Sequence, residues 1–239
     1  MSIPWLESDR IGFPSRKGAL SEPNGLLAAG GALSVEWLIQ AYTKGIFPWY
    51  EIGQPILWWT PNPRLILTPD SFKVSRSLKK LIKNHEYKIL FDNNFSEVIY
   101  QCSKARTESA GTWITPDMAS AYIDLHNAGH AHCVEVWSDS MIVGGLYGVA
   151  LGKVFFGESM FSRESNTSKL ALFYLTQQLK KWGFELIDCQ IHSDHLLSLG
   201  AINISREIFN EKLNELIVTT EGESGKWKIN LNDLSYKDE

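Results

Sequence analysis

The stretch from Gly144 to Asp194 constrains the fold of this chain more than any other part of the sequence. It begins in apolar runs interrupted by glycine, which predict an antiparallel hairpin over residues 141–161. An amphipathic pattern then predicts a helix over residues 167–182, and a short, largely apolar strand follows over residues 184–191. This order of hairpin, helix and strand indicates a fold of the α+β or mixed α/β class.

The last of these strands, residues 184–191, carries two polar side chains where apolar ones are expected. Side chains alternate between the faces of a strand, so Asp188 and Gln190 share one face while Ile187 and Cys189 share the other. Burying a carboxylate is costly unless it has partners. The two polar residues either satisfy loop amides near the strand end or form a pair at the floor of a cleft that orients a reacting group. The pattern alone leaves both explanations open.

Length and composition set the domain organisation. A chain of 239 residues with 44% hydrophobic side chains can form one large domain, or a small domain packed on a larger one. The run Thr60-Pro61-Asn62-Pro63 can continue neither a helix nor a central strand. We therefore predict a small N-terminal domain over residues 1–62 and a larger domain over residues 63–239. The polar tail from about residue 219 carries no pattern that predicts structure.

The composition also indicates the cellular setting. The three cysteines show no C-x-x-C spacing, which is typical of a reducing compartment. The sequence near Met1 lacks the pattern of a signal peptide, and no apolar run is long enough to span a bilayer. We expect a cytoplasmic monomer with no membrane partner. The formal net charge is −4, so any binding of nucleic acid requires a local basic patch.

Such a patch is predicted on a helix over residues 71–84. A second helix is expected over residues 95–103, followed by a polar loop to Ala110. A charged helical face is usually only solvated. On the first helix all charges on this face have one sign, which would suit contact with phosphates. The basic residues are Lys73, Arg76, Lys79, Lys80 and Lys83.

Two other kinds of site are disfavoured by the sequence. A metal site would use closely spaced histidines, but the chain has no H-E-x-x-H motif and the candidates fall on separate predicted elements. A thiol nucleophile would use Cys189, which alternation places on an apolar face where a thiol behaves as a small hydrophobic group. The histidines considered are His126, His130, His132, His192 and His195.

Six short motifs occur in a fixed order along most of the chain, from about residue 11 to residue 208. Together they closely resemble the bacterial leucyl/phenylalanyl-tRNA–protein transferase family. The motifs are GIFPW (Gly45–Trp49), PILWW (Pro55–Trp59), GTWIT (Gly111–Thr115), FGESMFS (Phe156–Ser162) with Ser168-Lys169, LIDCQ (Leu186–Gln190) and SLGA (Ser198–Ala201).

The resemblance implies a fold and an activity. The fold would be a small N-terminal domain packed on an acetyltransferase-like (GNAT-like) C-terminal domain, with no metal and no cofactor. The activity would be transfer of leucine or phenylalanine, and less well methionine, from charged tRNA to the N-terminal amine of proteins that begin with arginine or lysine. That transfer would mark the acceptor for degradation through the N-degron pathway.

The resemblance also implies roles for individual residues. Asp188 would polarise Gln190, which would orient the incoming amine, and Glu158 would position the aminoacyl group or the acceptor. Either Asp188 would take the proton of the amine or the ribose hydroxyl of the tRNA would assist, and the sequence leaves both open. Trp49 and Trp113 would stack on the terminal adenine. The basic face would contact the phosphates of the acceptor stem. An apolar pocket for the donor side chain would be lined by Leu146, Phe155, Met160 and Leu172.

That pocket depends on an irregularity in the predicted hairpin. By simple alternation, Phe155 and Met160 fall on opposite faces of their strand. Both can line one pocket only if Gly157 forms a β-bulge, which would also re-aim Glu158.

Two other functions compete with the transferase. A coenzyme-A acyltransferase of the same fold would bind pyrophosphate through a Q/R-x-x-G-x-G/A loop, and the loop of residues 162–166 before the 167–182 helix contains no glycine. A non-catalytic tRNA-binding module would need the basic face and the tryptophans but would show no turnover.

Overall fold

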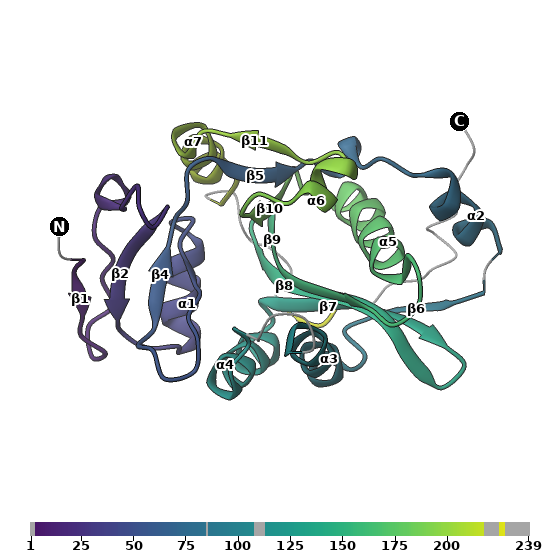
Figure 1. The fold of residues 1–239 in the computed structure, drawn as a ribbon, viewed down its shortest axis with the longest axis horizontal. Coiled ribbons are helices and arrows are strands. Elements are labelled where there is room, and N and C mark those ends of the chain that lie inside the picture. The colour runs from purple at the N-terminus through teal and green to yellow at the C-terminus, as the bar shows by residue number, and fades with distance from the viewer. Residues whose placement is uncertain (1–2, 85, 108–112, 218–224, 228–239) are drawn as a thin grey trace.

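The computed structural model describes residues 3–84, 86–107, 113–217 and 225–227 and contains two β-sheets (Figure 1). Within these residues the first sheet has four strands in the order β1-β2-β4-β3. Its strands are β1 (Trp5–Leu6), β2 (Leu26–Gly30), β3 (Phe47–Pro48) and β4 (Leu57–Trp59). Helix α1 (Val35–Tyr42) packs beside this sheet and begins at Ser34, whose Oγ accepts a hydrogen bond from the backbone N–H of Trp37.

The second sheet forms the centre of the molecule. Over the described residues it has seven strands in the order β11-β5-β10-β9-β8-β7-β6. Strands β6 to β9 form an antiparallel meander, and β10 pairs parallel to β9. The strands are β5 (Arg64–Leu67), β6 (Lys88–Phe91), β7 (Ala131–Ser138), β8 (Met141–Leu151), β9 (Val154–Ser162), β10 (Leu186–Gln190) and β11 (Ile202–Ile204).

Helices cover both faces of the second sheet (Figure 1). Helix α5 (Thr167–Lys181) crosses one face and connects the parallel strands β9 and β10, as a parallel pair requires. Helices α3 (Phe95–Thr107) and α4 (Pro116–Asn127) pack on the other face. The predicted mixed α/β class is therefore confirmed. The remaining helices are α2 (Arg76–Asn84), α6 (Asp194–Ser198) and α7 (Arg206–Ile217), with short 3₁₀ turns at Arg16–Gly18 and Pro69–Ser71.

Two helix boundaries differ from the prediction. Helix α2 begins at Arg76 and not at residue 71, so Lys73 lies outside it. The backbone N–H of Lys73 donates instead to the carbonyl of Leu199, and Ser75 caps the helix by accepting from the N–H of Leu78. Helix α3 continues through Thr107, beyond the predicted end at residue 103. The rest of the loop predicted to end at Ala110, residues 108–110, lies outside the described residues.

The predicted bulge in β9 is confirmed. Tyr147 of β8 pairs with Ser159, and the next residue, Gly148, pairs with Gly157. Glu158 is therefore the extra residue on β9, and its side chain is turned away from simple alternation. Strand β10 is also irregular at its end, because its register with β5 shifts before Gln190, whose φ is +64°.

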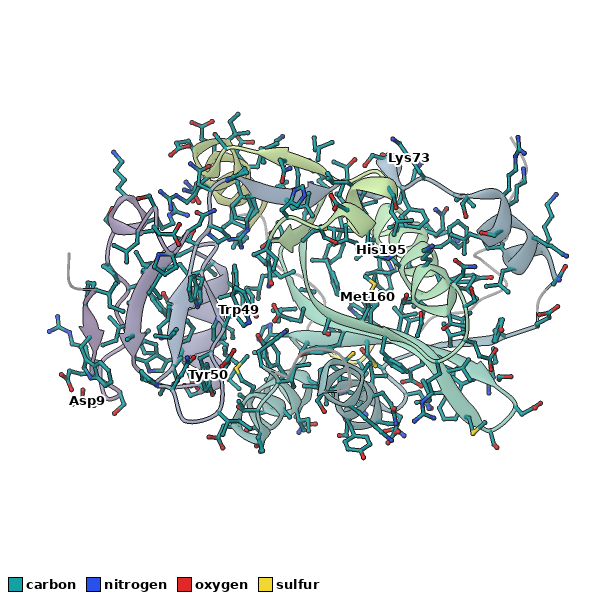
Figure 2. All side chains as sticks on the ribbon, in the orientation of Figure 1. Asp9, Trp49, Tyr50, Lys73, Met160 and His195 are labelled. Atoms are coloured by element: carbon teal, nitrogen blue, oxygen red, sulfur yellow. The ribbon has the colours of Figure 1, made fainter. Side chains whose placement is uncertain are left out.

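The core is continuous between the two sheets. A cluster of buried residues includes Trp37 and Tyr42 of α1, Trp58 of β4 and Phe156 of β9. Figure 2 shows Trp49 on the side of the first sheet, across from Met160 and His195. Among the described residues, no helix combines the length and the apolar character needed to cross a membrane.

Candidate active site

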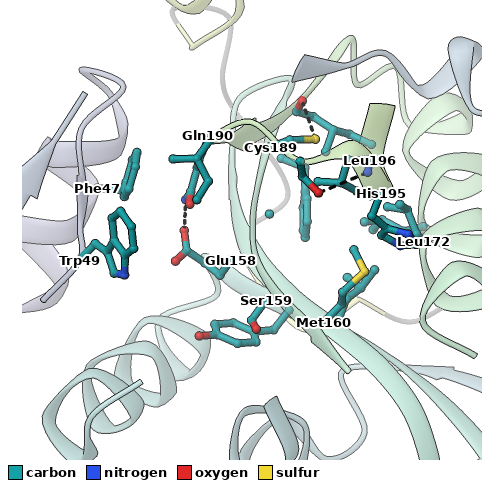
Figure 3. Close-up of a pocket in the computed structure, with 18 of the residues that line it drawn as sticks. Phe47, Trp49, Glu158, Ser159, Met160, Leu172, Cys189, Gln190, His195 and Leu196 are labelled. Atoms are coloured by element: carbon teal, nitrogen blue, oxygen red, sulfur yellow. Dashed lines mark hydrogen bonds between the residues drawn. The ribbon is translucent and has the colours of Figure 1, made fainter. Parts of the chain in front are cut away.

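A cavity of about 410 Å³ lies where β9 and β10 separate (Figure 3). The parallel pairing of these strands runs from Leu186–Val154 to Asp188–Phe156 and stops there, just before both strands become irregular. The carboxyl ends of parallel strands are a common position for ligand sites in α/β folds, and this volume is within the range of small-molecule pockets.

The apolar wall of the cavity contains every residue predicted for a donor pocket. Leu146, Phe155, Met160 and Leu172 all line the cavity. Phe155 and Met160 reach it from the same strand because the bulge lies between them. Further lining residues that were not predicted to belong to the pocket include Leu175, Ile187, Cys189 and Leu196.

Glu158 is the acidic residue of this cavity and is only 7% exposed. Its carboxylate accepts from Tyr42 at 2.6 Å and from Gln190 Nε2 at 2.6 Å through Oε1, and from Tyr122 at 2.9 Å through Oε2. The hydroxyl groups of Tyr42 and Tyr122 also hydrogen-bond to each other. The carboxylate that contacts the Gln190 carboxamide is thus Glu158, which differs from the expected contact with Asp188.

The hydroxyl and carboxylate contacts form a closed ring whose protons can be counted. Three oxygen–oxygen contacts join Tyr42, Tyr122 and Glu158, and each favourable contact holds one proton. Two neutral tyrosines beside an ionised carboxylate supply two protons, so one contact lacks its proton. A protonated carboxyl supplies the third proton. When Glu158 is ionised, the ring therefore has room for one more proton than the two that the tyrosines supply.

The electrostatic environment agrees with this count. The pKa of Glu158 is raised to about 7: burial is the largest cause, the three hydrogen bonds oppose part of its effect, and the negative charge of Asp188 adds a smaller increase. Burial and the neighbouring Glu158 also raise the pKa values of Tyr42 and Tyr122 well above their ordinary value, so both remain neutral. Near neutral pH, Glu158 can both accept and release a proton.

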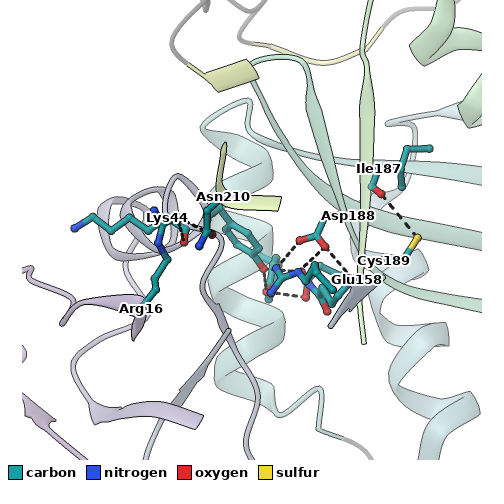
Figure 4. Close-up of polar contacts among 11 residues, drawn as sticks. Arg16, Lys44, Glu158, Ile187, Asp188, Cys189 and Asn210 are labelled. Atoms are coloured by element: carbon teal, nitrogen blue, oxygen red, sulfur yellow. Dashed lines mark hydrogen bonds and ion pairs between the residues drawn. The ribbon is translucent and has the colours of Figure 1, made fainter. Parts of the chain in front are cut away.

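Asp188 lies behind the cavity and does not line it. The residue is fully buried, and its carboxylate binds Arg64 through two hydrogen bonds, Nε at 2.8 Å and Nη2 at 2.6 Å (Figure 4). Its Oδ1 also accepts from the backbone N–H of Gln190 at 2.9 Å. Asp188 therefore contacts the main chain of Gln190, where the sequence analysis expected it to act on the carboxamide.

Arg64 is held by aromatic rings on two sides. The guanidinium carbon lies 5.0 Å from the ring centre of Phe47 and 4.6 Å from that of Phe209. Phe47 belongs to the first sheet and lines the cavity, whereas Phe209 belongs to α7. The buried ion pair thus connects the first sheet, the last helix and strand β10.

Arg64, Tyr42 and Tyr122 were not predicted as site residues from the sequence. The signal for Arg64 was a charged residue at the start of an apolar strand, directly after Pro63. The two tyrosines lie on buried faces of α1 and α4, where their spacing is that of ordinary core residues. Their hydroxyl groups become significant only because Glu158 lies between them.

Both predicted tryptophans line the cavity. Trp49 is exposed and Trp113 is half-buried. The backbone carbonyl of Trp49 accepts from Trp59 Nε1 at 2.6 Å, and the two indole rings lie 5.5 Å apart. This support holds an exposed aromatic face at the mouth of the cavity (Figure 3).

The histidines and the thiol near the cavity do not form a second reactive site. Burial, and then the charge of Lys169, lower the pKa of His195, which keeps this lining residue neutral. Burial raises the pKa of Cys189 far above its ordinary value, so its sulfur remains a thiol. Within the part of the chain that the structure describes, no three His, Cys, Asp or Glu side chains are grouped as metal ligands would be.

The predicted basic residues begin close to the cavity and extend away from it. Lys73 contacts the residue that follows α6, a helix whose His195 and Leu196 line the cavity. Figure 2 shows Lys73 and His195 on the same side of the molecule. Arg76, Lys80 and Lys83 are exposed on α2, and Lys79 is half-buried.

Comparison with known proteins identifies relatives across nearly the whole chain. A sequence model described as leucyl/phenylalanyl-tRNA protein transferase matches residues 66–214, and one for the N-terminal domain of that protein matches residues 31–62. A leucyl/phenylalanyl-tRNA–protein transferase from Nitrosospira multiformis is 56% identical over 90% of this chain and 92% of its own length. The protein of that name from Cellvibrio japonicus is 53% identical over 88% and 90%, respectively.

A solved structure of a GCN5-related N-acetyltransferase from Kribbella flavida matches with 14% identity and a TM-score of 0.39. The match covers 73% of this chain and 62% of the other chain. The sequence matches, together with the mixed α/β fold and its single-acid cavity, define the class of protein: this chain is an enzyme, an aminoacyltransferase. More narrowly, the chain belongs to the leucyl/phenylalanyl-tRNA–protein transferase family.

Proposed function

We propose that this enzyme moves leucine or phenylalanine, and less well methionine, from charged tRNA to the N-terminal α-amine of proteins that begin with arginine or lysine. The product would enter the N-degron pathway in the cytoplasm. The observation that carries the proposal is the cavity itself, in which an apolar pocket ends at the paired side chains of Glu158 and Gln190.

The apolar wall suits the donor side chain. Leu146, Phe155, Met160 and Leu172 offer a surface that gains free energy by burying leucine or phenylalanine, and smaller side chains lose part of that burial. A methionine in the wall can adapt to both branched and aromatic side chains. Trp49 and Trp113 lie at the opening, where they could stack on the terminal base that carries the ester.

The chemistry requires a proton acceptor but no covalent intermediate on the enzyme. An aminoacyl ester is already activated. When the amine nitrogen bonds to the carbonyl carbon, the bond to the ribose oxygen breaks, and one proton passes from nitrogen to that oxygen. Glu158 is proposed to receive this proton and return it, because it is the acidic side chain in the described cavity lining and its ring holds space for one proton.

Gln190 and Asp188 would then have supporting roles. The Gln190 carboxamide donates to Glu158, which leaves its own oxygen to accept from the incoming amine and orient it. Asp188 is proposed as a positioning residue, because it fixes the backbone of Gln190 from inside the protein. Its ion pair with Arg64 fixes Asp188 in turn.

A transfer assay tests this function. Radiolabelled Phe-tRNA is mixed with a peptide that begins with arginine, and label is expected in the peptide. Matched peptides with an acetylated N-terminus or an N-terminal aspartate should remain unlabelled. A coenzyme-A acyltransferase would instead label the peptide from an acyl thioester after ribonuclease treatment, and a plain tRNA-binding module would bind the donor without labelling the peptide. Either result would overturn the proposal.

The basic residues give a prediction about salt dependence. Changing Lys80 and Lys83 together to glutamine should weaken binding of charged tRNA and reduce the slope of log Kd against log salt concentration by about one for each lost phosphate contact. The measurement is a binding titration at several salt concentrations. Lys153 to glutamine is the control, because this lysine pairs with Glu185 on another part of the surface. An unchanged slope in the double variant would remove this face from the tRNA interface.

The raised pKa of Glu158 gives a prediction about pH. A carboxyl with a pKa of about 7 is ionised only above that value, so kcat should rise with pH through about 7 as the proton acceptor forms. The α-amine of the peptide titrates near pH 8 in its own right. Turnover at saturating donor and acceptor is therefore compared between the wild type and Glu158→Gln from pH 5.5 to 8. The rise of kcat with pH near pH 7 should be absent in the variant. If kcat of the variant still rises there, another group is responsible for the titration.

A further inference from the structure

Trp227 is a residue of the C-terminal tail that is buried in the core between the second sheet and helix α5. The sequence predicted no structure for this tail, yet Trp227 is only 8% exposed. Its ring stacks on His132 of β7, with centroids 3.8 Å apart and planes 3° from parallel. Its other ring contacts are with Phe91, Phe155, Trp182 and Phe184.

The position of Trp227 is fixed by hydrogen bonds as well as by packing. The backbone N–H of Trp227 donates to Asp92 Oδ2 at 2.7 Å, and the same oxygen contacts His132 Nδ1 at 2.7 Å. Asp92 Oδ1 accepts from the N–H of Cys133 at 2.8 Å, and all these groups are buried. Because Trp227 is held both through its backbone N–H and through the face of its ring, it forms a rigid support.

This support lies directly behind the wall of the donor pocket. The ring of Phe155 lines the cavity and lies 6.0 Å from the ring of Trp227. The same ring packs against Gly148, where an added Cβ would lie 2.6 Å from its edge. Phe155 therefore has the cavity in front of it, Gly148 at one side and Trp227 behind it, so its position determines how deep the pocket is.

We propose that Trp227 sets the depth of the donor pocket by supporting Phe155, and that it thereby helps to determine the preference between leucine and phenylalanine. Trp227 touches no substrate and is a positioning residue for specificity. The inference rests on the proposed function, because it assigns the cavity to the donor side chain. Without the indole, Phe155 can move back into the vacated volume and the pocket becomes deeper.

The test is the ratio of kcat/KM for Phe-tRNA to kcat/KM for Leu-tRNA. In Trp227→Ala the ratio should rise about tenfold, because a pocket that differs by one or two methylene groups discriminates by roughly that amount. Trp-tRNA should also become a detectable donor. Trp227→Phe restores an aromatic ring and should return the ratio toward the wild-type value. Trp182→Ala is the matched control, because Trp182 packs on Trp227 at 4.9 Å but, among the ring contacts of the described residues, has none with Phe155, so its ratio should stay at the wild-type value.

The outcomes separate this inference from the proposed function. A wild-type enzyme that uses neither donor contradicts the function itself. A wild type that uses both donors, with a Trp227→Ala variant that loses thermal stability but keeps the wild-type ratio, overturns the inference and leaves Trp227 as core only. If Trp227→Ala does not fold, Trp227→Leu fills more of the same volume. Its ratio must then rise by a smaller factor, and an unchanged ratio again overturns the inference.

Discussion

Replacing Glu158 with glutamine will lower kcat about 10²- to 10⁴-fold, which is the usual contribution of a positioned proton acceptor. Glutamine keeps the size of the side chain but cannot accept the amine proton, and it cannot complete the ring with Tyr42 and Tyr122 in the same way. Kd for charged tRNA should remain near the wild-type value, since the apolar wall and the tryptophans are unchanged. The measurements are single-turnover transfer and a binding titration.

The control for this variant is Glu164→Gln. Glu164 also accepts a hydrogen bond from a tyrosine, Tyr87, at 2.5 Å, but it is exposed and does not line the cavity. This variant should transfer as the wild type does. If Glu158→Gln keeps its turnover while Glu164→Gln behaves the same way, the proton acceptor must be sought elsewhere.

Removing the Asp188 carboxylate will have the largest effect on stability. Asp188→Ala leaves Arg64 buried and unpaired, and breaking a buried ion pair in this way costs about 3–5 kcal/mol in the free energy of unfolding. Turnover should fall as well, because the backbone N–H of Gln190 loses its acceptor. Urea denaturation measures the first effect and the transfer assay measures the second.

A double variant separates these two effects. Arg64→Met with Asp188→Leu replaces the pair by apolar side chains of similar volume, which often restores or exceeds the original stability. We expect a stable protein that remains poor in turnover, since the backbone N–H of Gln190 then lacks its carboxylate acceptor. Full recovery of both properties would show that Asp188 contributes to folding alone and would end its role as a positioning residue.

Much of the fold and of the apolar pocket could be predicted because these features follow local patterns. Short-range hydrophobic periodicity predicts the hairpin and the helix after it. One glycine inside a strand, Gly157, predicts the bulge. The pocket residues Leu146, Phe155, Met160 and Leu172 followed from the family motifs, and the bulge explains how they meet. The start of α2 was predicted too early because a tertiary hydrogen bond to Leu199 holds Lys73 outside the helix.

The polar network could not be predicted in the same way. Strand alternation placed Asp188 and Gln190 on one face, but the positive φ of Gln190 turns its carboxamide toward Glu158. Arg64 and Asp188 are 124 residues apart in the sequence, and no local pattern reports such a pairing. The role of a polar residue in a buried site depends on its hydrogen-bond partners, and these are brought together only when the chain folds.

The guanidinium of Arg64 has a mechanical consequence for the enzyme. It packs between the rings of Phe47 in the first sheet and Phe209 in α7, and it forms an ion pair with Asp188 of strand β10. Arg16 adds a second tie, from the chain before β2 to Lys44 and to Asn210 of α7. The first sheet, beside which Trp49 lies, and strand β10, which carries Gln190, are therefore mechanically coupled. A displacement of one would move the other with it and keep the ester end of the donor aligned with the approaching amine.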